Sequence, residues 1–144
     1  MGRITEENRR ILSAAKTYEE APLDGMNPSG FSRKLSTYIA EKKIPVQYIV
    51  DSTGLSKSYV NKLRNLKGIN VHPARPVVLN LGLALNLSLN EMDDLLKSAR
   101  YQELYSRDTD DSVIMWGLMH GLSGSEIRHK LYDMGLGKDI LRQD

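Results

Sequence analysis

The stretch from Val46 to Leu66 constrains the fold of this 144-residue chain more than any other part. Gly54 lies near its middle, where a short helix would end and where a backbone with positive φ is usually needed. Ser56 follows two residues later and is a favourable N-cap for a second helix. Val60 and Leu63 then recur at helical spacing. We therefore predict two short helices joined by a tight turn, with Val60 and Leu63 facing inward.

The outer face of the second predicted helix, residues 57–66, is polar and basic and has no acidic residue. It consists of Lys57, Ser58, Asn61 and Lys62. On the second helix of a helix-turn-helix, such a face is suited to the DNA major groove, where Asn favours adenine and Lys favours guanine. A polar helix face that is merely solvated is the alternative.

Several positions of this stretch follow a known pattern, namely Gln47, Ile49, Gly54, the pair Leu55-Ser56, the run Lys57-Ser58-Tyr59-Val60, and Leu63. At these positions the chain resembles the phage-repressor-like (Cro/repressor, XRE) helix-turn-helix family. The similarity covers about residues 31–99, and 84–88 resemble the end of the family's fourth helix before a capped fifth. Two positions depart from the family: Val50 stands where Ala is usual, and Arg64 where many members have Glu.

The resemblance implies an all-α, five-helix, lambda-repressor-like domain that binds double-stranded DNA. It implies a transcriptional regulator, by family habit a repressor, that acts as a homodimer on a palindromic operator. Gln47 would give its side-chain amide to a phosphate, and Ser56 would begin the recognition helix, whose first backbone amides add to phosphate binding. The Gly- and Pro-rich loop after this helix would follow the DNA backbone, with Lys67, Asn70 and Arg75 as phosphate-contact candidates. A plain solvated connection is the alternative for that loop.

The distribution of charge supports the same interpretation. The formal net charge is only +2, but residues 31–75 carry nine basic and two acidic side chains, a net charge of +7. Residues 1–30 carry a net charge of −1 and residues 76–144 a net charge of −4. Basic charge is thus concentrated where phosphate binding would need it. An uneven distribution by chance is the alternative.

We predict three parts for the chain: an N-terminal helical arm and linker over residues 1–30, the helix-turn-helix domain over 31–100, and a C-terminal helical hairpin over 101–144. Residues 3–20 have the apolar spacing of an amphipathic helix, and 21–30 contain two Pro and two Gly, as linkers often do. In the central part, periodicity predicts further helices over 31–43, 77–87 and 88–99.

The C-terminal hairpin repeats the pattern of the residues before it. A shift of 35 residues aligns six identical pairs: Gly82/Gly117, Leu83/Leu118, Leu87/Leu122, Ser88/Ser123, Glu91/Glu126 and Leu96/Leu131. Ser followed three residues later by Glu is the spacing of a helix capping box. We therefore expect a second capped hairpin that begins at Asp108 or Thr109 and ends at Gly135 and Gly137. Chance similarity between two capped hairpins is the alternative.

Three large apolar side chains, Met115, Trp116 and Met119, recur in the predicted C-terminal hairpin. Because such residues at helical spacing usually belong to the core, we expect them to be buried. A ligand pocket or a partner surface, above all a dimer interface, is the alternative.

No residue pattern indicates catalysis or a bound cofactor. The three histidines, His72, His120 and His129, lack the i, i+4 spacing of a metal pair, and cysteine is absent, so we expect no metal site. We expect no enzymatic activity. No apolar run is long enough to span a bilayer and the first residues are polar, so we expect a cytoplasmic protein without a membrane partner.

A second function stays open at this point. The same fold can serve as a protein-interaction module, such as an antitoxin, an anti-repressor or a regulatory subunit. The acidic hairpin over residues 108–140 would then be the surface that contacts the protein partner.

Overall fold

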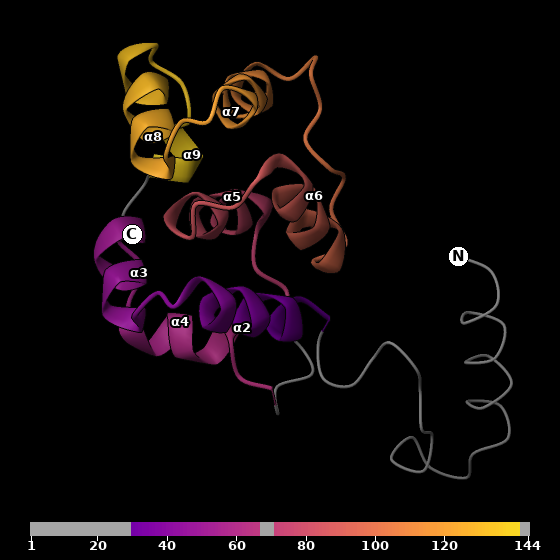
Figure 1. Ribbon diagram of the computed structural model, residues 1–144, viewed down its shortest axis with the longest axis vertical. Coiled ribbons are helices and arrows are strands. Elements are labelled where there is room, and N and C mark those ends of the chain that lie inside the picture. The colour runs from indigo at the N-terminus through magenta and orange to yellow at the C-terminus, as the bar shows by residue number, and fades with distance from the viewer. Residues whose placement is uncertain (1–29, 67–70, 142–144) are drawn as a thin grey trace, which may run out of the picture.

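The computed structural model describes residues 30–66 and 71–141, and within these ranges it is all-helical, with eight α-helices and no strand (Figure 1). In chain order they are α2 (Gly30–Lys42), α3 (Val46–Thr53), α4 (Lys57–Leu63), α5 (Arg75–Ala84), α6 (Leu89–Ser98), α7 (Thr109–Met119), α8 (Gly124–Asp133) and α9 (Lys138–Leu141). The all-α prediction is confirmed for this part of the chain. Two sets of predictions lie outside the described residues. They are the arm helix over 3–20 with most of the 21–30 linker, and the phosphate-contact candidates Lys67 and Asn70.

Helix α5 lies at the centre of the molecule. All residues from Val78 to Ala84 are buried, and the helix contacts α3, α6, α8 and α9 (Figure 1). It begins two residues before the predicted start, because Pro76 fits the first turn, where its missing N–H has no helical acceptor to lose. It ends earlier than predicted because Asn86 adopts a positive φ of 52°, which turns the chain into the next helix.

The turn between α3 and α4 forms as the sequence predicts. Gly54 has a φ of 76° and its amide donates to the Val50 carbonyl, which closes the end of α3. The Ser56 hydroxyl accepts a hydrogen bond from the Tyr59 amide at 3.1 Å and begins α4. Val60 is fully buried, as expected for the inner face of α4.

Helix α4 is shorter than predicted: it ends at Leu63 and not at Leu66. Its last carbonyls are taken by α2: the Ser32 hydroxyl donates to the Leu63 carbonyl at 2.6 Å, and the Ser36 hydroxyl donates to the Arg64 carbonyl at 2.8 Å. Leu66 then lies outside the helix, with 51% of its surface exposed.

The predicted repeat is present in the packing of both hairpins, α5–α6 and α7–α8. A Cβ on Gly82 would lie 2.3 Å from the Met92 sulfur, and a Cβ on Gly117 would lie 2.5 Å from Cγ1 of Ile127. A shift of 35 residues superposes both members of each contact. Both capping boxes also form, at Ser88–Glu91 and Ser123–Glu126. Each hairpin is therefore closed by a glycine that lets two helices approach.

The C-terminal hairpin packs directly on α5. A Cβ on Gly124 would overlap the Leu83 carbonyl, so the first turn of α8 rests on the end of α5. The Gly124 amide also donates to the Asn86 side-chain oxygen at 2.7 Å. One hydrophobic cluster consequently extends from Phe31 to Ile140.

Candidate nucleic-acid interface

The outer face of α4 is exposed as predicted. All four residues of this face, which we call the α4 face, are exposed: Lys57, Ser58, Asn61 and Lys62. The inner residues Val60 and Leu63 are buried and hold the helix against the core. Arg64, which follows the helix, donates through Nε to the Asn61 side-chain oxygen at 3.0 Å. The α4 face therefore presents two cations and two hydrogen-bonding side chains with no acidic residue among them.

Ser56 is occupied by its capping role. Its hydroxyl accepts from the Tyr59 amide, so the side chain terminates the turn and sets the start of α4. It lies next to Lys57 and is itself exposed. Ser56 therefore lies at the start of α4, next to the α4 face, where its role is to cap the helix.

Gln47 lies in the first turn of α3 and is exposed. Its side-chain nitrogen donates to the Asp51 carboxylate at 2.9 Å, one helical turn further on. A phosphate that accepts from this amide would have to replace that bond. Gln47 thus lies at the N-terminal end of α3, as predicted, and its side chain is hydrogen-bonded to Asp51 of the same helix.

Arg75 does not belong to the interface, and its prediction as a phosphate contact is wrong. Its guanidinium is bidentate to the buried Asp111 carboxylate, at 3.0 and 2.8 Å, and it also donates to the carbonyls of Gln102 and Glu103. The hydrogen bond to Asp111 raises the pKa of Arg75, so the side chain stays charged. This ion pair fastens the start of α7 to the start of α5.

Small polar side chains that the sequence patterns did not predict hold the end of α3 and the turn after it in place. The buried Asn80 donates to the Thr53 carbonyl at 2.9 Å, which joins α5 to the end of α3. The Thr53 hydroxyl donates to the Ile49 carbonyl at 2.7 Å and accepts from the Leu55 amide at 3.1 Å. A small polar residue on an otherwise apolar helix face, as Asn80 is on α5, was the available signal.

The surface of the C-terminal hairpin differs from the prediction. Trp116 and Met119 are 46% and 64% exposed, so they do not belong to the core as expected. Met115 is only partly buried against it. His120 packs against the Trp116 ring at a centroid distance of 5.0 Å, and the Lys130 ammonium lies 5.8 Å from the same ring. This apolar surface is distant in sequence from the α4 face.

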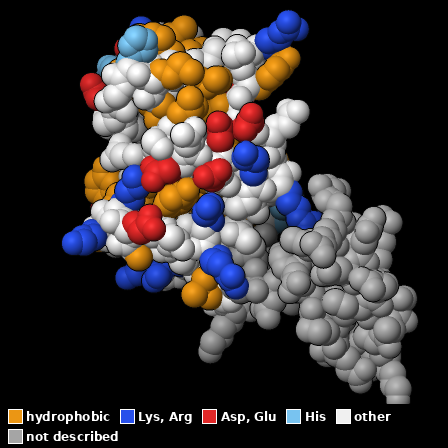
Figure 2. Space-filling view, turned by 45° about the vertical axis from the view of Figure 1, so that its right-hand side comes forward, with side chains coloured by type: hydrophobic (Ala, Val, Ile, Leu, Met, Phe, Trp, Pro, Cys, Tyr) orange, Lys and Arg blue, Asp and Glu red, His pale blue; other side chains and the backbone are white. Residues whose placement is uncertain are grey.

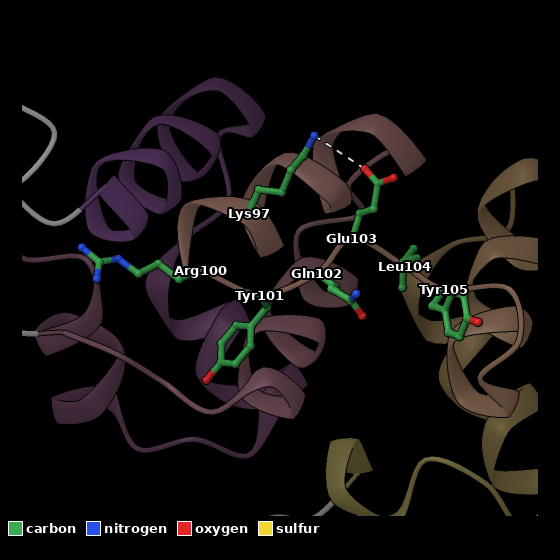
Figure 3. A pocket seen from close by; sticks show the side chains of 7 residues that line it. All are labelled: Lys97, Arg100, Tyr101, Gln102, Glu103, Leu104 and Tyr105. Carbon is green, nitrogen blue, oxygen red and sulfur yellow. Dashed lines mark ion pairs between the residues drawn. The ribbon is translucent and has the colours of Figure 1, made fainter. Parts of the chain in front are cut away.

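A shallow open cavity of about 590 Å³ follows α6. It is lined by one continuous stretch of residues, Lys97 and Arg100 to Tyr105 (Figure 3). Lys97 and Glu103 form an ion pair across it at 3.5 Å, while Arg100 extends away from Tyr105. The lining does not bring together a nucleophile, a base and an orienting group, so its arrangement offers no chemistry beyond an exposed ion pair.

Within residues 30–66 and 71–141, no group of three His, Cys, Asp or Glu side chains is placed to hold a metal ion. Among the helices of the same ranges, none combines the length and the apolar character needed to cross a bilayer. Comparison with known proteins adds no functional assignment, since no protein-family model, no curated protein and no solved structure matches this chain.

Proposed function

We propose that this protein is a sequence-specific DNA-binding regulator of transcription, acting as a repressor through a dimer on a palindromic operator. In this proposal α2 to α6 form the five-helix helix-turn-helix domain of the Cro/repressor type, and α4 is the recognition helix. The α4 face enters the major groove, which is wide enough for one helix.

One observation carries the proposal: a short helix with a buried apolar side presents four exposed side chains that are all cationic or hydrogen-bonding. Val60 and Leu63 fix the rotation of α4, so the α4 face points away from the core as a unit. Bonds from Ser32 and Ser36 hold its C-terminal end, and Ser56 caps its start. A helix held at both ends loses little conformational freedom when it binds, which favours base recognition over loose electrostatic contact.

Electrostatics supports the same surface. The segment 31–75 carries a net charge of +7, and Arg75 and Asp111 neutralise one another inside the fold. Lys57 and Lys62, which are exposed on the α4 face, can attract phosphates, a sequence-independent term that fades as salt rises. Gln47, Lys67 and Asn70 supply the phosphate contacts in the proposal.

The test is selection from a random duplex library with the purified full chain at moderate salt. Enrichment of a palindromic sequence is expected, since each copy reads one half-site. A library that stays unenriched, with only salt-sensitive binding to every duplex, would refute sequence-specific recognition.

A second candidate is a protein-interaction module with the same fold. The exposed Trp116 and Met119 favour it, because exposed aromatic and Met side chains are enriched in protein interfaces. This function would leave α4 without a nucleic-acid ligand. A binary complex with another protein, together with an absence of duplex binding at low salt, would support it over DNA binding.

A further inference from the structure

Helix α7 is apolar on every side once its first turn is complete. From Val113 to Met119 the helix contains no charged or hydrogen-bonding side chain other than the Trp116 indole. A helix that is apolar around its whole circumference is normally covered on all sides. In this chain only Asp111, Ile114 and Gly117 of α7 are buried. One side of α7 therefore lacks the cover that its composition calls for.

The repeat shows what such cover looks like. The 35-residue shift places Trp116 at the position of Leu81, and Met119 at the position of Ala84. Leu81 and Ala84 are 0% and 3% exposed, because α3, α8 and α9 all pack on α5. The equivalent pair on α7 is 46% and 64% exposed, because α7 makes its main helix contacts with α6 and α8 only on its other side. Figure 2 shows hydrophobic side chains gathered at the top of the molecule, where the C-terminal hairpin lies.

We propose that a second copy of this chain covers this surface, with α7 packed antiparallel against α7 of the other copy across a two-fold axis. The contact surface, which we call the α7 face, consists of Ser112, Met115, Trp116 and Met119. The inference deepens the proposed function, since a palindromic operator needs two copies, and it rests on that function for its biological purpose.

The charges at the two ends of the α7 face fit an antiparallel copy of the same face. Asp108 and Asp110 lie at the start of the helix, whereas Lys130 of α8 lies over the Trp116 ring near its end. An antiparallel pair places the acidic start of each α7 near Lys130 of the other copy, and the dipoles of the two α7 helices then run in opposite directions, which is favourable. A parallel pair would bring the acidic starts together. A two-fold contact repeats each favourable pairing twice, as an isologous interface does.

Sedimentation velocity of the full chain tests the proposal. The wild type is expected to sediment as a dimer, and Trp116→Glu and Met119→Glu are each expected to weaken the dimer by at least about tenfold, as loss of a central apolar anchor does. Both side chains are already largely exposed in one copy, so circular dichroism should show an unchanged helical fold. Tyr132→Glu is the control, because this aromatic residue on α8 is even more exposed, at 73%, and lies outside the α7 face, so its variant should remain dimeric.

Chemical cross-linking tests the geometry separately. The chain has no cysteine, so a single Ser112→Cys variant provides one defined thiol. A short bis-maleimide should join two copies through this thiol, whereas Thr37→Cys on the exposed side of α2 should give no cross-link. A monomeric wild type, a dimer that survives Trp116→Glu, or a dimer that Ser112→Cys does not cross-link would each overturn the proposal.

The two proposals fail in different ways. A dimer through α7 that enriches no duplex sequence would refute DNA recognition and leave the α7 interface standing. Enrichment of a palindrome by a protein that stays dimeric as Trp116→Glu would refute the α7 interface and leave DNA recognition standing.

Discussion

The Ser32 hydroxyl lies 2.6 Å from the carbonyl oxygen of Leu63 and donates a hydrogen bond to it, which ties the first turn of α2 to the last turn of α4. Both residues are buried, so no water can replace the bond. Ser32→Ala should therefore lower the free energy of unfolding by about 1–3 kcal/mol, the cost of an unsatisfied buried carbonyl. Urea titration measures this change in the free energy of unfolding. Ser36→Ala, whose bond to Arg64 is exposed, should cost less; an equal cost for both variants would contradict this explanation.

Base recognition and phosphate binding should separate in two alanine variants. Asn61→Ala, on the exposed α4 face, should relax base preference at one operator position. Lys67→Ala should instead weaken binding to all duplexes alike and lower the salt slope by about one. Titration of matched and mismatched duplexes at several salt concentrations measures both. Equal losses on every sequence for the two variants would refute this division of roles.

Arg75 should matter for stability and not for DNA contact. Arg75→Ala leaves the Asp111 carboxylate, which is 2% exposed, without its ion pair. Removing one partner of a buried pair costs about 3–5 kcal/mol, and we expect the lower end because Arg75 is partly exposed. Thermal unfolding measures the loss, and Arg107→Ala, an exposed arginine before α7, is the control. Unchanged stability with weakened duplex binding would restore Arg75 to the interface.

The two equivalent glycines should respond differently to alanine. A Cβ on Gly82 meets the far end of the flexible Met92 side chain, whereas a Cβ on Gly117 meets the β-branched Ile127. Overpacking costs about 1–3 kcal/mol, and alanine returns up to about 1 kcal/mol of helix propensity. Gly117→Ala should thus destabilise clearly and Gly82→Ala much less. Chemical denaturation of both variants decides it, and the reverse order would show that α5 is the more tightly packed copy.

Acid should weaken the contact between α2 and α6. Burial raises the pKa of Glu91, but the hydrogen bonds from Lys42 and Ser88 outweigh it and hold the pKa below the ordinary 4.5. A carboxylate with a lowered pKa stabilises the fold above pH 4.5, and this stabilisation is lost as the pH falls through the lower folded value. Unfolding of Glu91→Gln should show a smaller loss of stability in acid.

The control for this titration is Asp94→Asn, an exposed acid on the same helix, which should keep the acid sensitivity of the wild type. Asp93 works in the opposite sense, because burial raises its pKa and its charged form costs stability at neutral pH. An acid response of Glu91→Gln that matches the wild type would show that the Lys42 pair does not contribute.

Features set by neighbouring residues could be predicted from the sequence. The turn at Gly54 and the caps at Ser56, Ser88 and Ser123 depend on a few adjacent residues, and all form as expected. The inward position of Val60 follows from helical spacing in the same way. Local backbone chemistry therefore fixes where α3 ends and where α4, α6 and α8 begin.

Features set by distant residues could not be predicted. Arg75 binds Asp111, which lies 36 residues further along the chain. No local sequence pattern distinguishes an arginine that pairs with a carboxylate of its own fold from one that binds a phosphate. Trp116 has the spacing of a core residue, but its exposure depends on which helices pack on α7. The base preferences of the α4 face depend on the DNA, so they stay a prediction.

The position of α5, buried between α3 and α8, means that the protein cannot be divided at the end of the helix-turn-helix segment. Removal of the residues after 100 would strip Leu83 and the Asn86 side chain of their contacts with Gly124, and Arg75 of its bonds to Asp111. The half that would read DNA and the half that would join two copies share a single core helix. A substitution that destabilises either half should therefore also destabilise the other, and the two should unfold in one cooperative transition.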